Sequence, residues 1–146
     1  MENLNINSNT QKKIKLDFKN SKYATGRRKR SIAKVWVKKG SGNIYVNGLK
    51  MIDYFKRPVH QIIVTRPLEI SDVASNYDVK CSVKGGGLSG QAGAIILGIS
   101  KALISHDENL KKNLKKDKLT TRDSRVVERK KYGHRKARRS FQFSKR

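Results

Sequence analysis

The sequence has little of what many small proteins use to hold themselves together. Cys81 is the only cysteine, so no internal disulfide can form and a reducing compartment is favoured. Hydrophobic residues make up 36% of the 146 residues, against roughly 45–50% in typical globular chains. No apolar run approaches the roughly 18–20 residues that span a bilayer. These shortages exclude a disulfide scaffold and predict one domain with a modest core.

Acidic residues are also scarce, because 11 Asp and Glu stand against 35 Lys and Arg, for a net charge of +24. A charge of this size repels itself, and a polyanion relieves the repulsion. Nucleic acid is therefore favoured over a membrane or an acidic protein as the partner. His60, His106 and His134 are scattered, and no cysteine or acidic pair has metal-ligand spacing, so no metal, cofactor or enzymatic centre is predicted.

The charge divides the chain into three zones. Residues 1–21 have few apolar residues and no clear period, which predicts a disordered leader without the features of a secretory signal or transit peptide. Residues 22–118 hold the predicted globular domain. Residues 119–146, the predicted basic helix and extended tail, carry 11 basic and 2 acidic residues and are the most basic zone. The simplest prediction is a cytoplasmic protein.

Alternating patterns predict the strands. Ala33, Val35 and Val37 alternate with polar or aromatic residues, and turn residues then lead to a short returning strand over 44–46. Residues 77–84 alternate most clearly, with Cys81 in the apolar row. Because free cysteine is among the most buried residue types, a packed thiol is favoured over a nucleophile.

Helices are predicted elsewhere. Residues 91–105 carry a stripe of small residues beside an apolar stripe, and the small ones are Ala94, Gly98 and Ala102. Small residues let a helix backbone approach a sheet, which compensates the roughly 1 kcal/mol that an interior glycine costs. Residues 49–55 also predict a short helix, whereas 60–66 fit either a helix or a strand, closed by Pro67. The predicted fold class is α+β, a mainly antiparallel sheet with helices on one face.

A glycine loop, Gly85-Gly86-Gly87, precedes the predicted long helix. Glycines permit positive φ, and the first amides of a helix carry partial positive charge, so the loop can form an anion nest. It does not match the nucleotide-binding pattern Gly-x-x-x-x-Gly-Lys-Ser/Thr, because Gln91 stands where lysine is needed. Three interpretations stay open: a tight turn into a closely packed helix, a contact to an RNA phosphate that includes Gln91, and a mononucleotide site.

Four consecutive cations, Arg27, Arg28, Lys29 and Arg30, open the first predicted strand. They repel one another unless an anion lies against them, which favours phosphate contact over a solvated cluster.

The third zone begins with a predicted basic helix. Thr120 with Asp123 resembles a capping box, and Gly133 suits a helix end. Val126 and Val127 are its only aliphatic side chains and are adjacent, so a protein core cannot hold this helix. RNA offers phosphates and bases to arginine instead. The predicted RNA contacts are Arg122, Arg125, Arg129, Lys130 and Lys131.

The 14 residues from 133 to 146 cannot pack as a domain. Fully extended they reach at most roughly 45–50 Å. Binding to RNA is predicted for Arg135, Lys136, Arg138 and Arg139. A solvated tail or a localisation signal is the alternative.

Four stretches in a fixed order carry a family resemblance. They are 25–33 (TGRRKRSIA), 85–94 (GGGLSGQAGA), 121–131 (TRDSRVVERKK) and 142–146 (QFSKR). Together they resemble the ninth protein of the small ribosomal subunit in its bacterial-type form, from about Lys22 to the last residue. Two positions depart from the pattern: Phe141 stands where relatives often have proline, and Ile96 where many have arginine.

The resemblance implies a fold like the second domain of another small-subunit ribosomal protein, which some kinases share. It implies ribosomal RNA binding in the head of the small subunit and a tail that reaches the peptidyl-tRNA site. The implied tRNA contacts are Ser144, Lys145 and Arg146. The implied partners are ribosomal RNA, peptidyl-site tRNA and neighbouring small-subunit proteins, with no membrane. An organellar ribosome is not excluded.

Two rival functions belong to other classes. A small phosphotransferase would use the glycine loop and would show saturable nucleotide binding or turnover. A free nucleic-acid chaperone would not sediment stoichiometrically with small subunits after a moderate salt wash.

Overall fold

Strands β2 (Ser31–Lys39) and β5 (Tyr77–Lys84) lie at the centre of a five-stranded sheet in the order β1-β2-β5-β3-β4. The flanking strands are β1 (Lys22–Arg28), β3 (Ile44–Val46) and β4 (Leu49–Lys50). The pairing of β3 with β5 is parallel and the other three are antiparallel. The structure is a computed structural model that describes residues 18–145, so the predicted leader lies, up to residue 17, outside the described residues.

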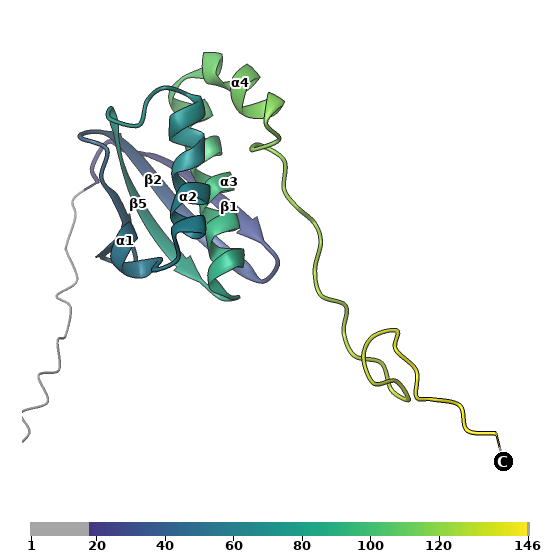
Figure 1. The fold of residues 1–146 in the computed structure, drawn as a ribbon. Coiled ribbons are helices and arrows are strands. Elements are labelled where there is room, and N and C mark those ends of the chain that lie inside the picture. Colours follow the sequence, from purple (N-terminus) through teal and green to yellow (C-terminus); the bar gives the residue numbers. More distant parts are fainter. Residues whose placement is uncertain (1–17, 146) are drawn as a thin grey trace, which may run out of the picture.

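Helices α2 (Pro58–Ile70) and α3 (Leu88–His106) cover one face of this sheet (Figure 1). The short α1 (Met51–Tyr54) follows β4, and a 3-10 turn, η1 (Glu108–Leu110), leads into α4 (Lys111–Lys116). Together with the mainly antiparallel sheet, this confirms the predicted α+β fold.

The core lies between the sheet and the two long helices. Along β2 and β5 alternate residues are buried as predicted, and Cys81 is among them. Burial raises the pKa of the Cys81 thiol, which makes it a packing residue rather than a nucleophile. Ile95, Ile99 and Leu103 of α3 are fully buried in this core. With 19 residues, α3 is long and apolar enough by length and composition to cross a membrane, contrary to the expectation that no such run exists, but most of it is buried inside this fold.

The chain between β3 and β5 differs from the prediction. Residues 49–55 do not form one helix, because the first two pair with β3 and only four residues are helical. The ambiguous stretch is helical, and α2 continues through Pro67, which was expected to end it. Pro67 lies in the last turn and costs one backbone hydrogen bond there. The buried Val64 and Leu68 around it are the packing that opposes this cost.

One predicted helix boundary and one predicted helix are also corrected. Helix α3 begins at Leu88, directly after the glycine loop, rather than at Gln91. The basic helix expected between Thr120 and Gly133 is wrong: residues 120–131 are without helix and run extended away from the body (Figure 1). The capping pattern is a local signal, and without an apolar stripe no tertiary packing stabilises a helix here.

Candidate nucleic-acid interface

The basic run lies on a hairpin. Arg27 and Arg28 end β1, and Lys29 and Arg30 form the turn into β2, so the run joins two strands instead of opening the first one. Lys29 adopts a left-handed φ of 51°, which closes the turn. Arg27, Lys29 and Arg30 are exposed.

The glycine loop packs against this hairpin turn. Gly85 and Gly86 have φ of 73° and 65°, the region that favours glycine. A Cβ on Gly85 would lie 2.6 Å from the Arg30 carbonyl oxygen. The loop therefore brings backbone groups next to the basic turn, a contact between segments far apart in the sequence.

Gln91 has an internal role. Its Nε2 donates a hydrogen bond to the Gly85 carbonyl oxygen at 3.3 Å, and its Oε1 accepts one from the Tyr54 hydroxyl at 2.7 Å. These bonds fix the glycine loop to α3 and favour the tight-turn interpretation for Gln91. The exposed backbone of Gly85, Gly86 and Gly87 still faces solvent.

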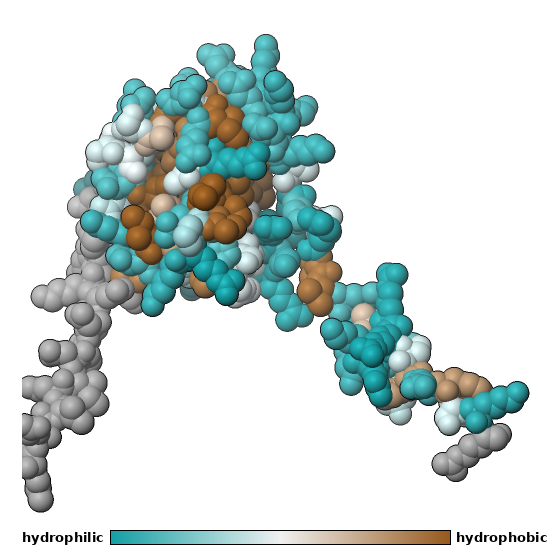
Figure 2. Space-filling view, viewed as in Figure 1, coloured by the Kyte–Doolittle hydropathy of each residue, from teal (hydrophilic) through white to brown (hydrophobic). Residues whose placement is uncertain are grey.

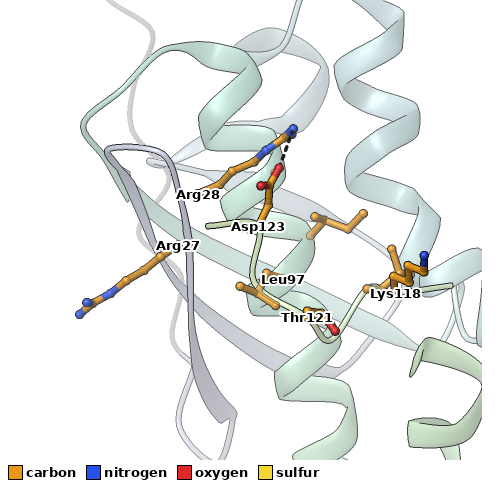
Figure 3. A pocket seen from close by; sticks show the side chains of 9 residues that line it. Arg27, Arg28, Leu97, Lys118, Thr121 and Asp123 are labelled. Carbon is orange, nitrogen blue, oxygen red and sulfur yellow. Dashed lines mark ion pairs between the residues drawn. The ribbon is translucent and has the colours of Figure 1, made fainter. Parts of the chain in front are cut away.

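Arg28 turns inward, unlike the other three cations of the run. Its side chain lies over Gly93, where a Cβ would meet the Arg28 Cδ at 2.2 Å. Its Nη2 lies 3.5 Å from Oδ2 of Asp123, and Figure 3 shows the two side chains meeting while Arg27 points away. The buried Arg28 Nε has no hydrogen-bond partner within residues 18–145. Arg28 thus ties the start of the tail to the body.

Asp123 is the anchor on the tail side. Its Oδ1 accepts hydrogen bonds from the backbone N–H and the Nε of Arg125, both at 3.0 Å, and its Oδ2 accepts from Nη2 of Arg125 at 2.9 Å. The Arg125 guanidinium, then its backbone amide and the charge of Arg28, hold the pKa of Asp123 well below its usual range. The carboxylate expected to cap a helix instead binds the arginine two residues on.

Beyond this anchor the tail adds nothing to the hydrophobic core, because no side chain from residue 121 to residue 145 is buried. Figure 2 shows the tail as mostly hydrophilic, in contrast to the apolar side chains that gather on the body. The predicted contacts Arg122, Arg129, Lys130 and Lys131 lie on the extended stretch and are exposed; with no helix present they do not share a helix face.

A family model described as Ribosomal protein S9/S16 matches residues 26–146. The chain belongs to the ribosomal protein S9/S16 family. The match begins within β1 and takes in the body, the hairpin turn, the glycine loop and the whole tail. Members of this family are structural ribosomal proteins that bind ribosomal RNA, and such proteins are generally not enzymes. The partners of the chain are ribosomal RNA and other ribosomal proteins, and its place is on the ribosome.

The family's tail stretch forms a groove with the body. The groove has a volume of about 480 Å³. Its lining comes from the hairpin turn, the glycine loop and residues 126–130 of the tail, and the turn and loop residues are Lys29, Arg30, Gly86 and Gly87. Two exposed apolar side chains, Val126 and Val127, lie in this groove among the cations.

Further along, the tail folds back into a small loop that the sequence did not predict (Figure 1). The backbone N–H of Arg135 donates to the Arg139 carbonyl oxygen at 2.8 Å, and the Arg135 guanidinium lies 5.6 Å from the Phe141 ring centre. Gly133, with φ of 70°, begins this loop rather than ending a helix. Glu128 accepts a hydrogen bond from Arg138 at 3.0 Å.

The loop presents the cations Arg135, Lys136, Arg138 and Arg139 to solvent. Ser144 and Lys145 beyond it are exposed, and Arg146 lies outside the described residues.

The histidines do not assemble a site. His60 shares a hydrogen bond with Ser89 at 3.0 Å, His106 contacts Tyr77, and His134 contacts Ser140, each in a different part of the molecule. Within residues 18–145 no three His, Cys, Asp or Glu side chains lie where they could hold a metal ion together.

Proposed function

We propose that this protein is a constituent of the small ribosomal subunit, and that its hairpin turn, glycine loop and tail bind the RNA of that subunit. The observation that carries the proposal is the tail: it is strongly basic, and none of its described side chains is buried. A segment of this kind buries no apolar side chain that could offset its ordering entropy, whereas surrounding phosphates supply it with charge-assisted contacts.

The proposed RNA contacts fall into two groups. On the body they are the exposed cations of the turn and the loop backbone, namely Arg27, Lys29, Arg30 and Gly85–Gly87. On the tail they are Arg122, Arg125, Arg129, Lys130, Lys131, Arg135, Lys136, Arg138 and Arg139. Arg28 was predicted in the same role, but its contact with Asp123 supports a structural one.

We further propose that the tail ends at peptidyl-site tRNA, as the family resemblance implies. Arg146 can bind a phosphate through two parallel hydrogen bonds, Lys145 supplies a point charge, and Ser144 a hydroxyl. Phosphate contacts position a nucleic acid without identifying its sequence, which suits a site that must accept every tRNA. The tail leaves the body extended, which gives it the reach for such a contact (Figure 1).

Removal of Ser144–Arg146 tests the tail's role. We expect the truncated protein to enter small subunits stoichiometrically, measured by sucrose-gradient sedimentation after a moderate salt wash. Peptidyl-site tRNA should dissociate roughly tenfold faster or more, because a hydrogen bond to a charged group contributes about 1.5–3 kcal/mol.

The matched control is Lys111→Ala with Lys112→Ala, which removes two exposed cations from α4 of the body. Its tRNA dissociation rate should stay at the wild-type value. Failure of the truncated protein to assemble would give the tail end a different role, and unchanged tRNA dissociation would remove the tRNA contact from the proposal.

A further inference from the structure

The sheet has a second face, opposite to the one that α2 and α3 cover. The strand register places Tyr23 beside Trp36 and Trp36 beside Lys80 across three adjacent strands. Lys34 precedes Trp36 on the same outward side of β2. Arg27 and Lys84, which both pair with Ile32, lie on this side at the hairpin end. We call these six residues the outer sheet face.

Aromatic rings form the middle of the outer sheet face. The ring centres of Tyr23 and Trp36 lie 5.4 Å apart, and Tyr23 is 49% exposed. The Lys80 ammonium lies 5.9 Å from the Trp36 ring centre and 5.7 Å from that of Phe18. Two neighbouring aromatic rings, whose planes are tilted by 42°, therefore lie with a nearby cation on the side of the sheet away from the core.

The outer sheet face is positively charged. Lys34 and Lys84 are exposed, and Arg27 continues the face into the basic hairpin turn. Asp78 is the one carboxylate at the outward positions of β1, β2, β3 and β5. Its Oδ1 accepts hydrogen bonds from the backbone N–H groups of Ser41 at 3.0 Å and Asn43 at 2.8 Å, so it is engaged in holding the β2–β3 turn.

We infer that the outer sheet face binds unpaired RNA nucleotides, with a base stacked on the exposed Tyr23 ring beside Trp36 and phosphates held by the surrounding cations. Unpaired RNA offers both features that this face complements, flat bases and a regular row of negative charges. A duplex hides its bases, and an acidic protein surface has no flat rings to match the aromatic pair. The inference rests on the proposed RNA binding and adds a site separate from the turn, the glycine loop and the tail.

Trp36 is the only tryptophan in the chain, so its fluorescence reports on this face alone. The full-length protein is titrated with a labelled single-stranded 12-mer of uridine and with an RNA hairpin duplex of equal phosphate number. Anisotropy of the label measures total binding, and Trp36 emission measures occupancy of the outer sheet face. We expect the oligouridine to quench Trp36 saturably and the duplex to bind with little quenching.

Two substitutions of Tyr23 distinguish the loss of a ring on which a base can stack from a general effect of changing this residue. Tyr23→Leu should weaken oligouridine binding by roughly 5- to 150-fold, the loss of one stacked base, and should reduce the quenching. Tyr23→Phe keeps the ring and should bind and quench like the wild type.

Oligouridine binding without quenching of Trp36, equal quenching by the duplex, or an unchanged affinity for Tyr23→Leu would each overturn the inference and leave the proposed function standing. Absence of any anisotropy change with either RNA would instead count against the proposed function itself.

Discussion

Gly26 is the residue on which the contact between β1 and α3 depends. A Cβ at this position would lie 1.9 Å from the carbonyl oxygen of Ala94 and 2.6 Å from the amide nitrogen of Gly98. Both atoms belong to the helix backbone, which cannot rotate away as a side-chain end can. Gly98 in turn faces Val35, whose Cγ2 would be 2.5 Å from an added Cβ. The small residues predicted to let α3 approach the sheet thus do so, and β1 contributes a glycine of its own.

Gly26→Ala should therefore destabilise the fold by about 1–3 kcal/mol or more, because the added methyl group forces the strand and helix apart. Urea unfolding measures this as a lower midpoint with an unchanged slope. Gly87→Ser is the control: its φ of −103° suits any residue, serine is favoured at the N-cap position that Gly87 holds in α3, and nothing lies within 4 Å of the added Cβ. Its midpoint should correspond to a change within about 0.5 kcal/mol. Equal effects of the two substitutions would show that the helix adjusts freely over β1.

At the scale of the element, the first stretch of the tail is held by Asp123. Arg125, and to a smaller degree Arg28, lower the pKa of Asp123. The ionic contacts of Asp123 should therefore weaken only as the pH falls. A carboxyl with a depressed pKa keeps its ionic contacts at every pH above the ordinary value, and loses them only as the pH falls through the depressed one. The anchor should therefore persist at pH values at which an ordinary aspartate, with a pKa of about 3.9, is already protonated.

The NMR titration of the Asp123 carboxyl carbon checks this. We expect its midpoint well below that of an ordinary aspartate in the wild type, and closer to about 3.9 in Arg125→Gln, which loses the largest cause of the depression. Arg122→Gln removes the same charge one residue before Asp123 and is the control; its midpoint should stay low. A low midpoint in Arg125→Gln as well would mean that Arg125 does not anchor this carboxylate.

An element can be predicted from the sequence when large apolar residues mark the side that it buries. Strands β2 and β5 alternate strongly because large apolar side chains mark their buried sides. Strand β1 was not predicted, since its core-facing positions include Ala24 and Gly26, which carry no hydrophobic signal. The tail helix was predicted from a local capping pattern that no tertiary contact supports.

The candidate site was predictable by composition but not by geometry. The clusters of cations and the glycine loop can be recognised in the sequence as runs of consecutive residues. Their meeting at one end of the sheet depends on the β1–β2 hairpin and on the pairing of β2 with β5, which no local pattern specifies. The Arg28–Asp123 contact and the outer sheet face were missed for the same reason. The alternation of Lys34, Trp36 and Lys38 was the signal that could have indicated the outer sheet face.

At the scale of the whole molecule, the distribution of charge matters more than its total. The body is held by a buried core, whereas the last 28 residues carry 11 cations and none of their described side chains is buried. Binding of the isolated protein to RNA should therefore be controlled by release of counterions from the phosphates that these cations neutralise.

This predicts a steep salt dependence. If roughly 7–10 phosphates are neutralised, the logarithm of the binding constant should fall with the logarithm of salt concentration with a slope of roughly −5 to −7 on single-stranded RNA. Replacing Arg138 and Arg139 by Gln should make the slope shallower by about 1 to 1.5, because each lost contact removes about 0.7. Ile62→Ala, a change on the exposed apolar side of α2, should leave the slope unaltered. A slope near zero in the wild type would be incompatible with phosphate neutralisation, and so with a tail that becomes ordered on RNA.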